Sequence, residues 1–216
     1  MSSAPAKLKP VKSDSAAANS NPPQDGRVWT RAVLFFALLV TGLAADLLTK
    51  HYTFGHYFDP ELELHRFAQE QHYWIPGVFG IQTSTNGGAL FGMGQGGSTW
   101  FAALSLVFFV GILVWLFAWG GARDRWLTAA LGLISGGILG NFYDRIGWGF
   151  TPGHPESIRY HVRDWILFRL EGVPNFDPWP NFNLADCWLV IGAGLLLIHA
   201  LWLSPSSVSA QPPSKS

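Results

Sequence analysis

Two aspartates, Asp164 and Asp186, lie where apolar stretches of the chain give way to polar ones. A carboxylate in water-poor surroundings at a membrane costs free energy, so such a residue is first a candidate for function. Two carboxylates held close together share one proton, and a pair of this kind can act as a general base and a general acid. What these two acids can do depends on the elements that position them.

Polar residues recur at one end of three apolar stretches. Within each set they are mostly three or four residues apart, a spacing that places side chains on one face of a helix. The sets are Asp46 with Lys50, then Asn141 with Asp144 and Arg145, and finally Asn183 with Asp186. All three are expected at one membrane face, where Asp164 joins them from an adjoining loop. Because these polar residues are all expected at one depth in the membrane, they favour a polar site over scattered surface residues.

Each set also has a purely structural interpretation. Asp46 and Lys50 can form an ion pair at the membrane interface, with the lysine extended toward the headgroups. Asn183 suits the N-cap of a helix and Asp186 its first turn, so helix capping explains both. Asp144 can simply mark the point where a helix leaves the membrane.

The composition indicates a membrane protein. Of the 216 residues, 49% are hydrophobic and 13% are charged, whereas roughly 25% are charged in a typical soluble domain. Four stretches have about the 20 residues that a membrane-spanning helix needs, and they lie at about 30–50, 98–119, 125–146 and 184–203. The sequence predicts an all-α membrane protein whose four transmembrane helices form one domain, residues 28–203.

Basic residues predict the orientation of the chain. Lys7, Lys9, Lys12, Arg27 and Arg31 precede the first span, and Arg123 and Arg125 separate the second from the third. Because short cytoplasmic segments are rich in Lys and Arg, both regions are expected in the cytoplasm. Residues 1–27 and 204–216 are then disordered cytoplasmic tails, and segments 51–97 and 147–183 lie outside.

The two external segments have different patterns. In the first, short β-prone runs at 72–75 and 78–83 are broken by Pro and Gly, which predicts a small sheet on the membrane. In the second, we expect a short amphipathic helix from Tyr160 to Leu170, with Arg159, Arg163 and Arg169 near the headgroups.

Several function classes lack support in the sequence. A net charge of zero leaves no basic face for nucleic acid. The single cysteine, Cys187, excludes an intramolecular disulfide, and the seven histidines have no tight ligand spacing, so no metal site is expected. The glycines between Gly132 and Gly140 favour close contact between helices.

Five motifs in order resemble the lipoprotein signal peptidases, also called signal peptidase II, a family of four-span aspartic proteases of the bacterial inner membrane. They are Asp46-Leu47-Leu48-Thr49-Lys50, Asn86-Gly87-Gly88-Ala89-Leu90-Phe91, the stretch from Gly136 to Arg145, Val162-Arg163-Asp164-Trp165, and Phe182-Asn183-Leu184-Ala185-Asp186. The resemblance covers the chain from roughly Arg31 to Leu203. It implies four transmembrane helices, a small extracytoplasmic β-cradle and a short extracytoplasmic helix.

The resemblance also implies roles for individual residues. The two catalytic aspartates fall on Asp164 and Asp186. Positions that line the site, bind the substrate or orient the acids fall on Asp46, Lys50, Asn86, Gly88, Asn141, Arg145 and Asn183. The implied substrate is a prolipoprotein with a diacylglyceryl-modified cysteine, cleaved just before that cysteine in contact with membrane lipid. No metal or organic cofactor is implied, and we expect a monomer in the inner membrane with its site at the outer face.

The chain departs from the family pattern in the second external segment. An insertion at 147–161 and an extension at 172–180 flank the motif that contains Asp164, which is followed by Trp165 where phenylalanine is typical. Asp177, within the extension, is therefore a rival for the first catalytic position. Two other classes stay open: a small transporter or lipid-binding protein that uses the same polar cluster, and a structural membrane subunit.

Overall fold

The computed structural model describes residues 24–62, 69–88, 96–150, 155–177 and 179–203. Four helices dominate this part of the chain: α1 (Gln24–Tyr57), α2 (Ser98–Leu113), α3 (Arg125–Arg145) and α4 (Leu184–Ile198). Helix α2 continues as a π-helical turn, Val114–Ala118, and α4 as another, His199–Leu203. Of the expected tails at 1–27 and 204–216, residues 1–23 and 204–216 lie outside the described residues, whereas residues 24–27 belong to α1.

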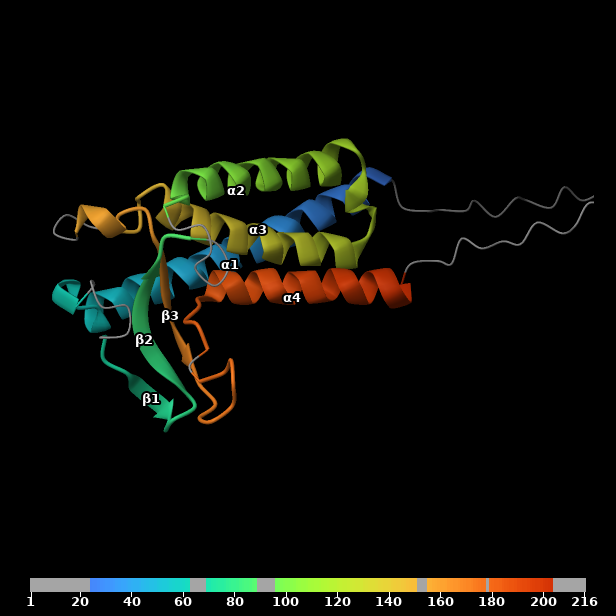
Figure 1. Ribbon diagram of the computed structural model, residues 1–216. Coiled ribbons are helices and arrows are strands. Elements are labelled where there is room, and N and C mark those ends of the chain that lie inside the picture. Colours follow the sequence, from blue (N-terminus) through green and yellow to red (C-terminus); the bar gives the residue numbers. More distant parts are fainter. Residues whose placement is uncertain (1–23, 63–68, 89–95, 151–154, 178, 204–216) are drawn as a thin grey trace, which may run out of the picture.

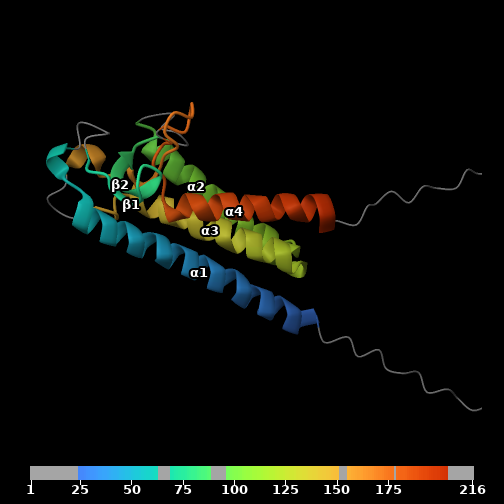
Figure 2. The same ribbon diagram turned by 90° about the horizontal axis from the view of Figure 1, so that it is seen from below.

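The four helices run side by side as a bundle (Figures 1 and 2). Each is long and apolar enough to cross a membrane, and many large apolar side chains point outward, such as Val107 and Val190. Because exposed apolar surface of this extent suits lipid better than water, the chain is a multi-pass membrane protein. The expected fold class is confirmed.

Helix α3 lies at the centre of the bundle because its glycines permit close approach. A Cβ at Gly136 would lie 3.0 Å from the carbonyl oxygen of Leu39 in α1, and one at Gly137 would lie 2.5 Å from that of Ala185 in α4. These contacts leave no room for a side chain. The backbones of α1, α3 and α4 are therefore brought together, as the glycine-rich stretch predicts.

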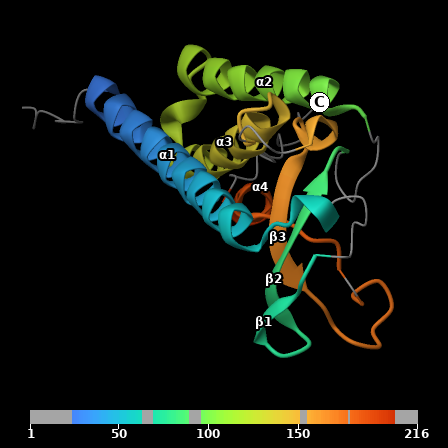
Figure 3. The same cartoon turned by 90° about the vertical axis from the view of Figure 1, so that its left-hand side faces the viewer.

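A three-stranded antiparallel sheet lies at one end of the bundle, with its strands running across the helix direction (Figure 1). Strands β1 (His72–Ile75) and β2 (Phe79–Asn86) come from the first external segment, as expected. Strand β3 (Val162–Phe168) comes from the second and pairs with β2, so that Ser84 lies opposite Asp164. Figure 3 shows β3 passing close to α1 and α4 at this end.

The prediction of an amphipathic helix from Tyr160 to Leu170 is wrong. Most of this segment is strand β3, and the short helix of the region is the 3-10 turn Glu156–Ile158. Residues 162–168 are rich in β-branched and aromatic side chains, which favour a pleated, half-buried surface. Pairing with β2 then supplies the backbone hydrogen bonds that a helix would otherwise provide.

Candidate active site

Asn183 forms hydrogen bonds with both candidate catalytic aspartates, Asp164 and Asp186. Its Nδ2 donates to Asp164 Oδ1 at 2.7 Å, and its backbone N–H donates to Asp186 Oδ2 at 3.1 Å. Asp164 comes from β3 and Asp186 from the first turn of α4, so one residue contacts two acids from different elements. The side chain of Asn183 is fully buried, which fixes the direction of both bonds.

Helix capping is also confirmed for these residues. Asn183 Oδ1 accepts from the backbone N–H of Asp186 at 3.0 Å, and together with the reverse bond this completes a capping box at the start of α4. The capping interpretation and the site interpretation are therefore compatible. The cap is what holds Asp186 against Asn183.

Asn141 and Lys50 continue the network toward α1. Asn141 Nδ2 donates to Asp186 Oδ1 at 2.9 Å, while its Oδ1 accepts from Lys50 Nζ at 3.0 Å and from Asn183 Nδ2 at 3.2 Å. This pattern fixes the orientation of the amide, because donors and acceptors on every partner match only one way round. The second carboxylate oxygen of Asp186 therefore also has a hydrogen-bond donor.

Lys50 is buried among acids rather than extended toward the headgroups. Its Nζ lies 2.8 Å from Asp46 Oδ2 and 3.1 Å from Asp144 Oδ2, and all three side chains have no exposed surface. Asp46 Oδ1 also accepts from the backbone N–H of Ala185, at 2.9 Å. The interpretation of Asp46 and Lys50 as a pair at the membrane interface is therefore wrong, since the pair links α1 to α3 and α4.

Arg163 was expected near the headgroups, and that expectation is wrong too. The side chain is only 4% exposed. Its Nε and Nη2 lie 2.9 and 2.7 Å from Asp144 Oδ1, and its backbone N–H donates to Asp144 Oδ2 at 3.1 Å. Asp144 belongs to one of the predicted polar sets, but it was given no role in the site, and Arg163 was not predicted there; the strand-like composition of 162–168 is the signal that points to a buried Arg163.

The remaining predicted residues, Arg145, Gly88 and Asn86, contact one another. Arg145 Nη2 donates to the carbonyl oxygen of Gly88 at 2.9 Å, and the guanidinium lies 5.5 Å from the ring centre of Phe101. Asn86 Oδ1 accepts from the backbone N–H of Gly88 at 3.0 Å, which forms a tight turn after β2. The motif continues into residues 89–95, which lie outside the described residues.

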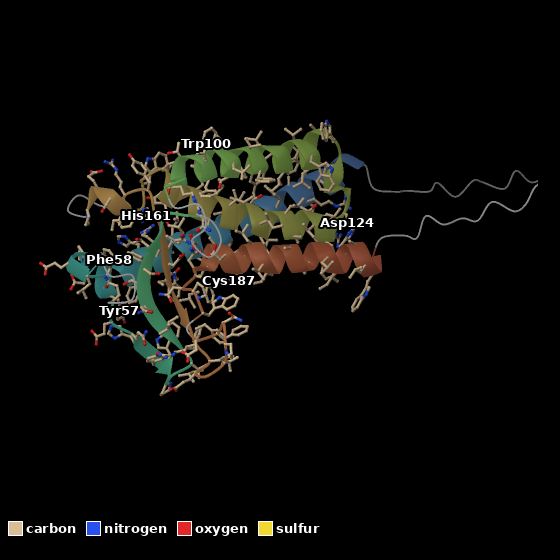
Figure 4. The ribbon with its side chains drawn as sticks, viewed as in Figure 1. Tyr57, Phe58, Trp100, Asp124, His161 and Cys187 are labelled. Atoms are coloured by element: carbon tan, nitrogen blue, oxygen red, sulfur yellow. The ribbon has the colours of Figure 1, made fainter. Side chains whose placement is uncertain are left out.

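A cavity of about 720 Å³ opens beside the two aspartates. Asp164, Asp186, Asn141, Arg145 and Asn86 supply its polar wall. The rest of the wall is mostly apolar and comes largely from α2 and α4, from which Leu104, Phe108, Val190 and Ile191 contribute. Cys187 also lines it, near the point where α4 begins (Figure 4). The cavity thus places an apolar groove next to two carboxylates.

The two carboxylates differ in their surroundings. Burial raises the pKa of Asp164 well above its ordinary value, and the nearby charge of Asp186 raises it further. Asp186 is only half-buried and lies in the first turn of α4. Burial therefore favours the protonated form of Asp164.

Asp177, the rival for the first catalytic position, lies elsewhere. Its carboxylate bonds Arg169 Nε and accepts from the backbone N–H of Gly172 at 2.9 Å, which together fold the extension into a tight loop. These bonds lower its pKa, the Gly172 N–H contributing most. Asp177 does not line the cavity. Among the residues that the structure describes, no three His, Cys, Asp or Glu side chains gather as a metal-binding group.

The chain is similar to known proteins over most of its length. Residues 38–202 match a family described as signal peptidase (SPase) II. A lipoprotein signal peptidase of Rhodopirellula baltica is 44% identical over 170 residues, 79% of this chain and 72% of that protein. Another, of Pseudomonas putida, is 33% identical over 180 residues, covering 82% of this chain and 90% of that protein.

A solved structure supports the same fold. It is described as a bacterial membrane enzyme determined by the in meso method at 2.3 Å resolution, and it aligns with a TM-score of 0.56 and 22% identity. The alignment covers 86% of this chain and 95% of the other. The shared architecture, the family match and the identity to curated relatives agree, and the chain belongs to the signal peptidase II family.

Proposed function

We propose that this protein is an aspartic endopeptidase that removes signal peptides from prolipoproteins, with Asp164 and Asp186 as its catalytic pair. Its substrate is a prolipoprotein whose cysteine carries a diacylglyceryl group, and cleavage falls just before that cysteine. Membership of the family supports prolipoprotein processing and does not favour a transporter or a lipid-binding protein. We further propose that the chain acts as a monomer without a metal or organic cofactor.

One observation carries the assignment of the pair: Asn183 bonds both carboxylates at the polar end of an apolar cavity. Asp164 and Asp186 are 22 positions apart in the sequence and come from a strand and a helix. Asn183 donates to Asp164 through its side chain and to Asp186 through its backbone N–H, and one residue therefore holds both acids. Asp177 lacks any such link to the cavity.

The chemistry follows from one proton shared by two carboxylates. With the proton on Asp164, the ionised Asp186 takes a proton from a water molecule, which attacks the carbonyl carbon of the scissile peptide bond. Asp164 then protonates the developing oxygen. The carbon–nitrogen bond breaks as Asp186 gives the proton it took to the leaving nitrogen, and Asp164 recovers a proton from the hydroxyl that becomes the new carbonyl. Each such transfer typically accelerates a reaction by roughly 10²- to 10⁴-fold. Arg145 adds a donor for the peptide backbone or a lipid ester, because its Nε has no hydrogen-bond partner among the described residues.

The apolar part of the cavity supports a lipid-modified substrate. Val190 is 71% exposed and Phe108 58%, so this wall continues onto the lipid-facing surface of the bundle. An acyl chain gains about 0.8 kcal/mol for each CH₂ that it buries in the bilayer, which holds a diacylglyceryl cysteine near headgroup depth. A cavity that faces lipid on one side and carboxylates on the other suits that position.

The same geometry supports an active site at the outer face of the inner membrane. The sheet and the acids lie at one end of the bundle, whereas the loop that contains Asp124 lies at the other end (Figure 4). Arg123 and Arg125 flank Asp124, and such basic segments favour the cytoplasm. With that loop inside, both termini are cytoplasmic and the carboxylates face outward.

The test is a processing assay with purified protein in detergent micelles. We expect a precursor with a diacylglyceryl cysteine to be shortened and the unmodified precursor to be left intact. Asp164→Asn and Asp186→Asn should each abolish cleavage while the protein still elutes as a folded species. Asp177→Asn is the matched control and should cleave normally. Normal cleavage by Asp164→Asn, with loss in Asp177→Asn, would overturn the assignment of the pair.

A further inference from the structure

Arg163 is bound to Asp144 through both its side chain and its main chain. The guanidinium lies 2.7 and 2.9 Å from Oδ1, and the backbone N–H lies 3.1 Å from Oδ2. Asp144 is fully buried in α3, so the contact ties β3 to a helix of the bundle. A Cβ at Gly149 would overlap Asp144 Oδ1, which shows how tightly the chain closes over this pair. The next residue along β3 is Asp164.

A charge count shows a second consequence of this contact. Asp46, Lys50, Asp144 and Arg163 form one buried cluster with two negative and two positive charges. Lys50 also donates to Asn141, which in turn bonds an acid of the proposed pair. Without the guanidinium, this neighbouring cluster would hold one uncompensated negative charge in low-dielectric surroundings.

We propose that Arg163 is a positioning residue for the reaction, which anchors Asp164 through Asp144 and makes the adjoining charged cluster neutral. This inference rests on the proposed function. Successive residues of a strand point to opposite faces of the sheet, so the side chain of Arg163 grips Asp144 while that of Asp164 reaches Asn183. Displacing the first side chain therefore displaces the second.

The charges that act on Asp164 come from three helices. The neighbouring strand β2 contributes only uncharged residues at Ser84, Thr85 and Asn86, and α2 contributes apolar residues and Ser105 to the cavity. The charged groups near Asp164 are Asp186 of α4, Lys50 of α1, Asp144 and Arg145 of α3, and Arg163 of its own strand. Of these, Arg163 is the cation on β3 that compensates the negative charge of Asp144.

Removing the positive charge should change the pH dependence of cleavage. In Arg163→Gln the charge of Asp144 is no longer compensated from β3, and a nearby negative charge disfavours ionisation of a carboxyl. The acid limb of the kcat/KM profile, where the base of the pair must ionise, is expected to move to higher pH by about one unit. A residue with a purely structural role would lower activity without moving this limb.

Three variants separate charge from position. Arg163→Lys keeps the charge but loses the two-point contact, so its acid limb should stay in place while kcat falls about tenfold or more. Arg163→Gln should show both the lower kcat and the shifted limb. The double variant Asp144→Asn with Arg163→Gln restores neutrality, so its acid limb should return toward that of the unaltered protein while kcat stays low.

The control is Arg159→Gln, an exposed arginine of the same segment that pairs with Glu156, and it should match the unaltered protein. An unmoved acid limb in Arg163→Gln would overturn the charge role, and an undiminished kcat in Arg163→Lys would overturn the positioning role. If Arg163→Gln does not fold, Arg163→Met is measured in its place with the same expected shift. Absence of cleavage by the unaltered protein would instead overturn the proposed function, and this inference with it.

Discussion

Replacing Asn183 with serine separates the two roles of this residue. Serine caps a helix about as well as asparagine, so the backbone N–H of Asp186 keeps an acceptor at the start of α4. The shorter hydroxyl loses the bonds that Asn183 Nδ2 donates, 2.7 Å to Asp164 Oδ1 and 3.2 Å to Asn141 Oδ1. Helix α4 should therefore stay folded while the two acids lose the group that joins them.

The size of the effect follows from the kind of bond that is lost. Each neutral hydrogen bond contributes about 0.5–1.5 kcal/mol, so the two bonds that serine loses amount to about 1–3 kcal/mol, and about 1.4 kcal/mol corresponds to a factor of ten in rate. If the bond to Asp164 organises the acids, kcat/KM of Asn183→Ser should fall roughly ten- to a hundredfold. Asn183→Ala should lose the same activity and, in addition, about 1 kcal/mol of stability from the missing cap.

The assay combines precursor cleavage with thermal unfolding in the same detergent. Asp124→Ala provides the control, because Asp124 caps α3 by accepting from the backbone N–H of Leu127 at 3.0 Å, at the opposite end of the bundle. It should lower the unfolding temperature and leave kcat/KM unchanged. Full activity in Asn183→Ser would refute the role of the bond to Asp164. Equal stability of the serine and alanine variants would refute the separation of the two roles.

Three further variants test the electrostatics and the packing of the site. Lys50→Met leaves two buried carboxylates without their shared cation, so the free energy of unfolding should fall by about 3–5 kcal/mol; an unchanged chemical-denaturation midpoint would contradict this. Because burial raises the pKa of Asp164, the folded chain binds more protons than the unfolded chain above the ordinary carboxyl range, and stability is lost as pH rises. Asp164→Asn should therefore unfold at a higher temperature than the unaltered protein at pH 7, with the difference closing toward pH 4; a lower unfolding temperature at pH 7 would speak against it. Gly140→Ala places a methyl group against Asp46 Oδ2 and should cost about 1–3 kcal/mol of stability, whereas Gly111→Ala meets no atom within 4 Å and should unfold like the unaltered protein.

The sequence predicts the polar sets well because each is a local pattern. Spacings of three and four place Asn141 and Arg145 on one side of α3 whatever that helix contacts, and both line the cavity. The burial of Lys50 has no such local signal. In an isolated Asp46–Lys50 pair, one negative charge compensates one positive charge. Such a pair is as compatible with the membrane interface as with a protein interior. Only Asp144, 94 positions further along the chain, supplies the second acid that makes burial of the lysine favourable.

The error over the segment from Tyr160 to Leu170 has a physical cause that bears on the site. Read alone, the segment combines basic residues with the apolar run 165–168, a composition that fits an amphipathic helix at the headgroups. Pairing with β2 decides the conformation of this segment, because residues 162–168 form hydrogen bonds along the edge of that strand. A helix would turn adjacent side chains by about 100°, whereas a strand sends them to opposite faces. Only the strand lets Arg163 reach Asp144 in α3 while Asp164 reaches Asn183 at α4. The strand conformation that makes the helical prediction wrong therefore also brings Asp164 close to Asp186.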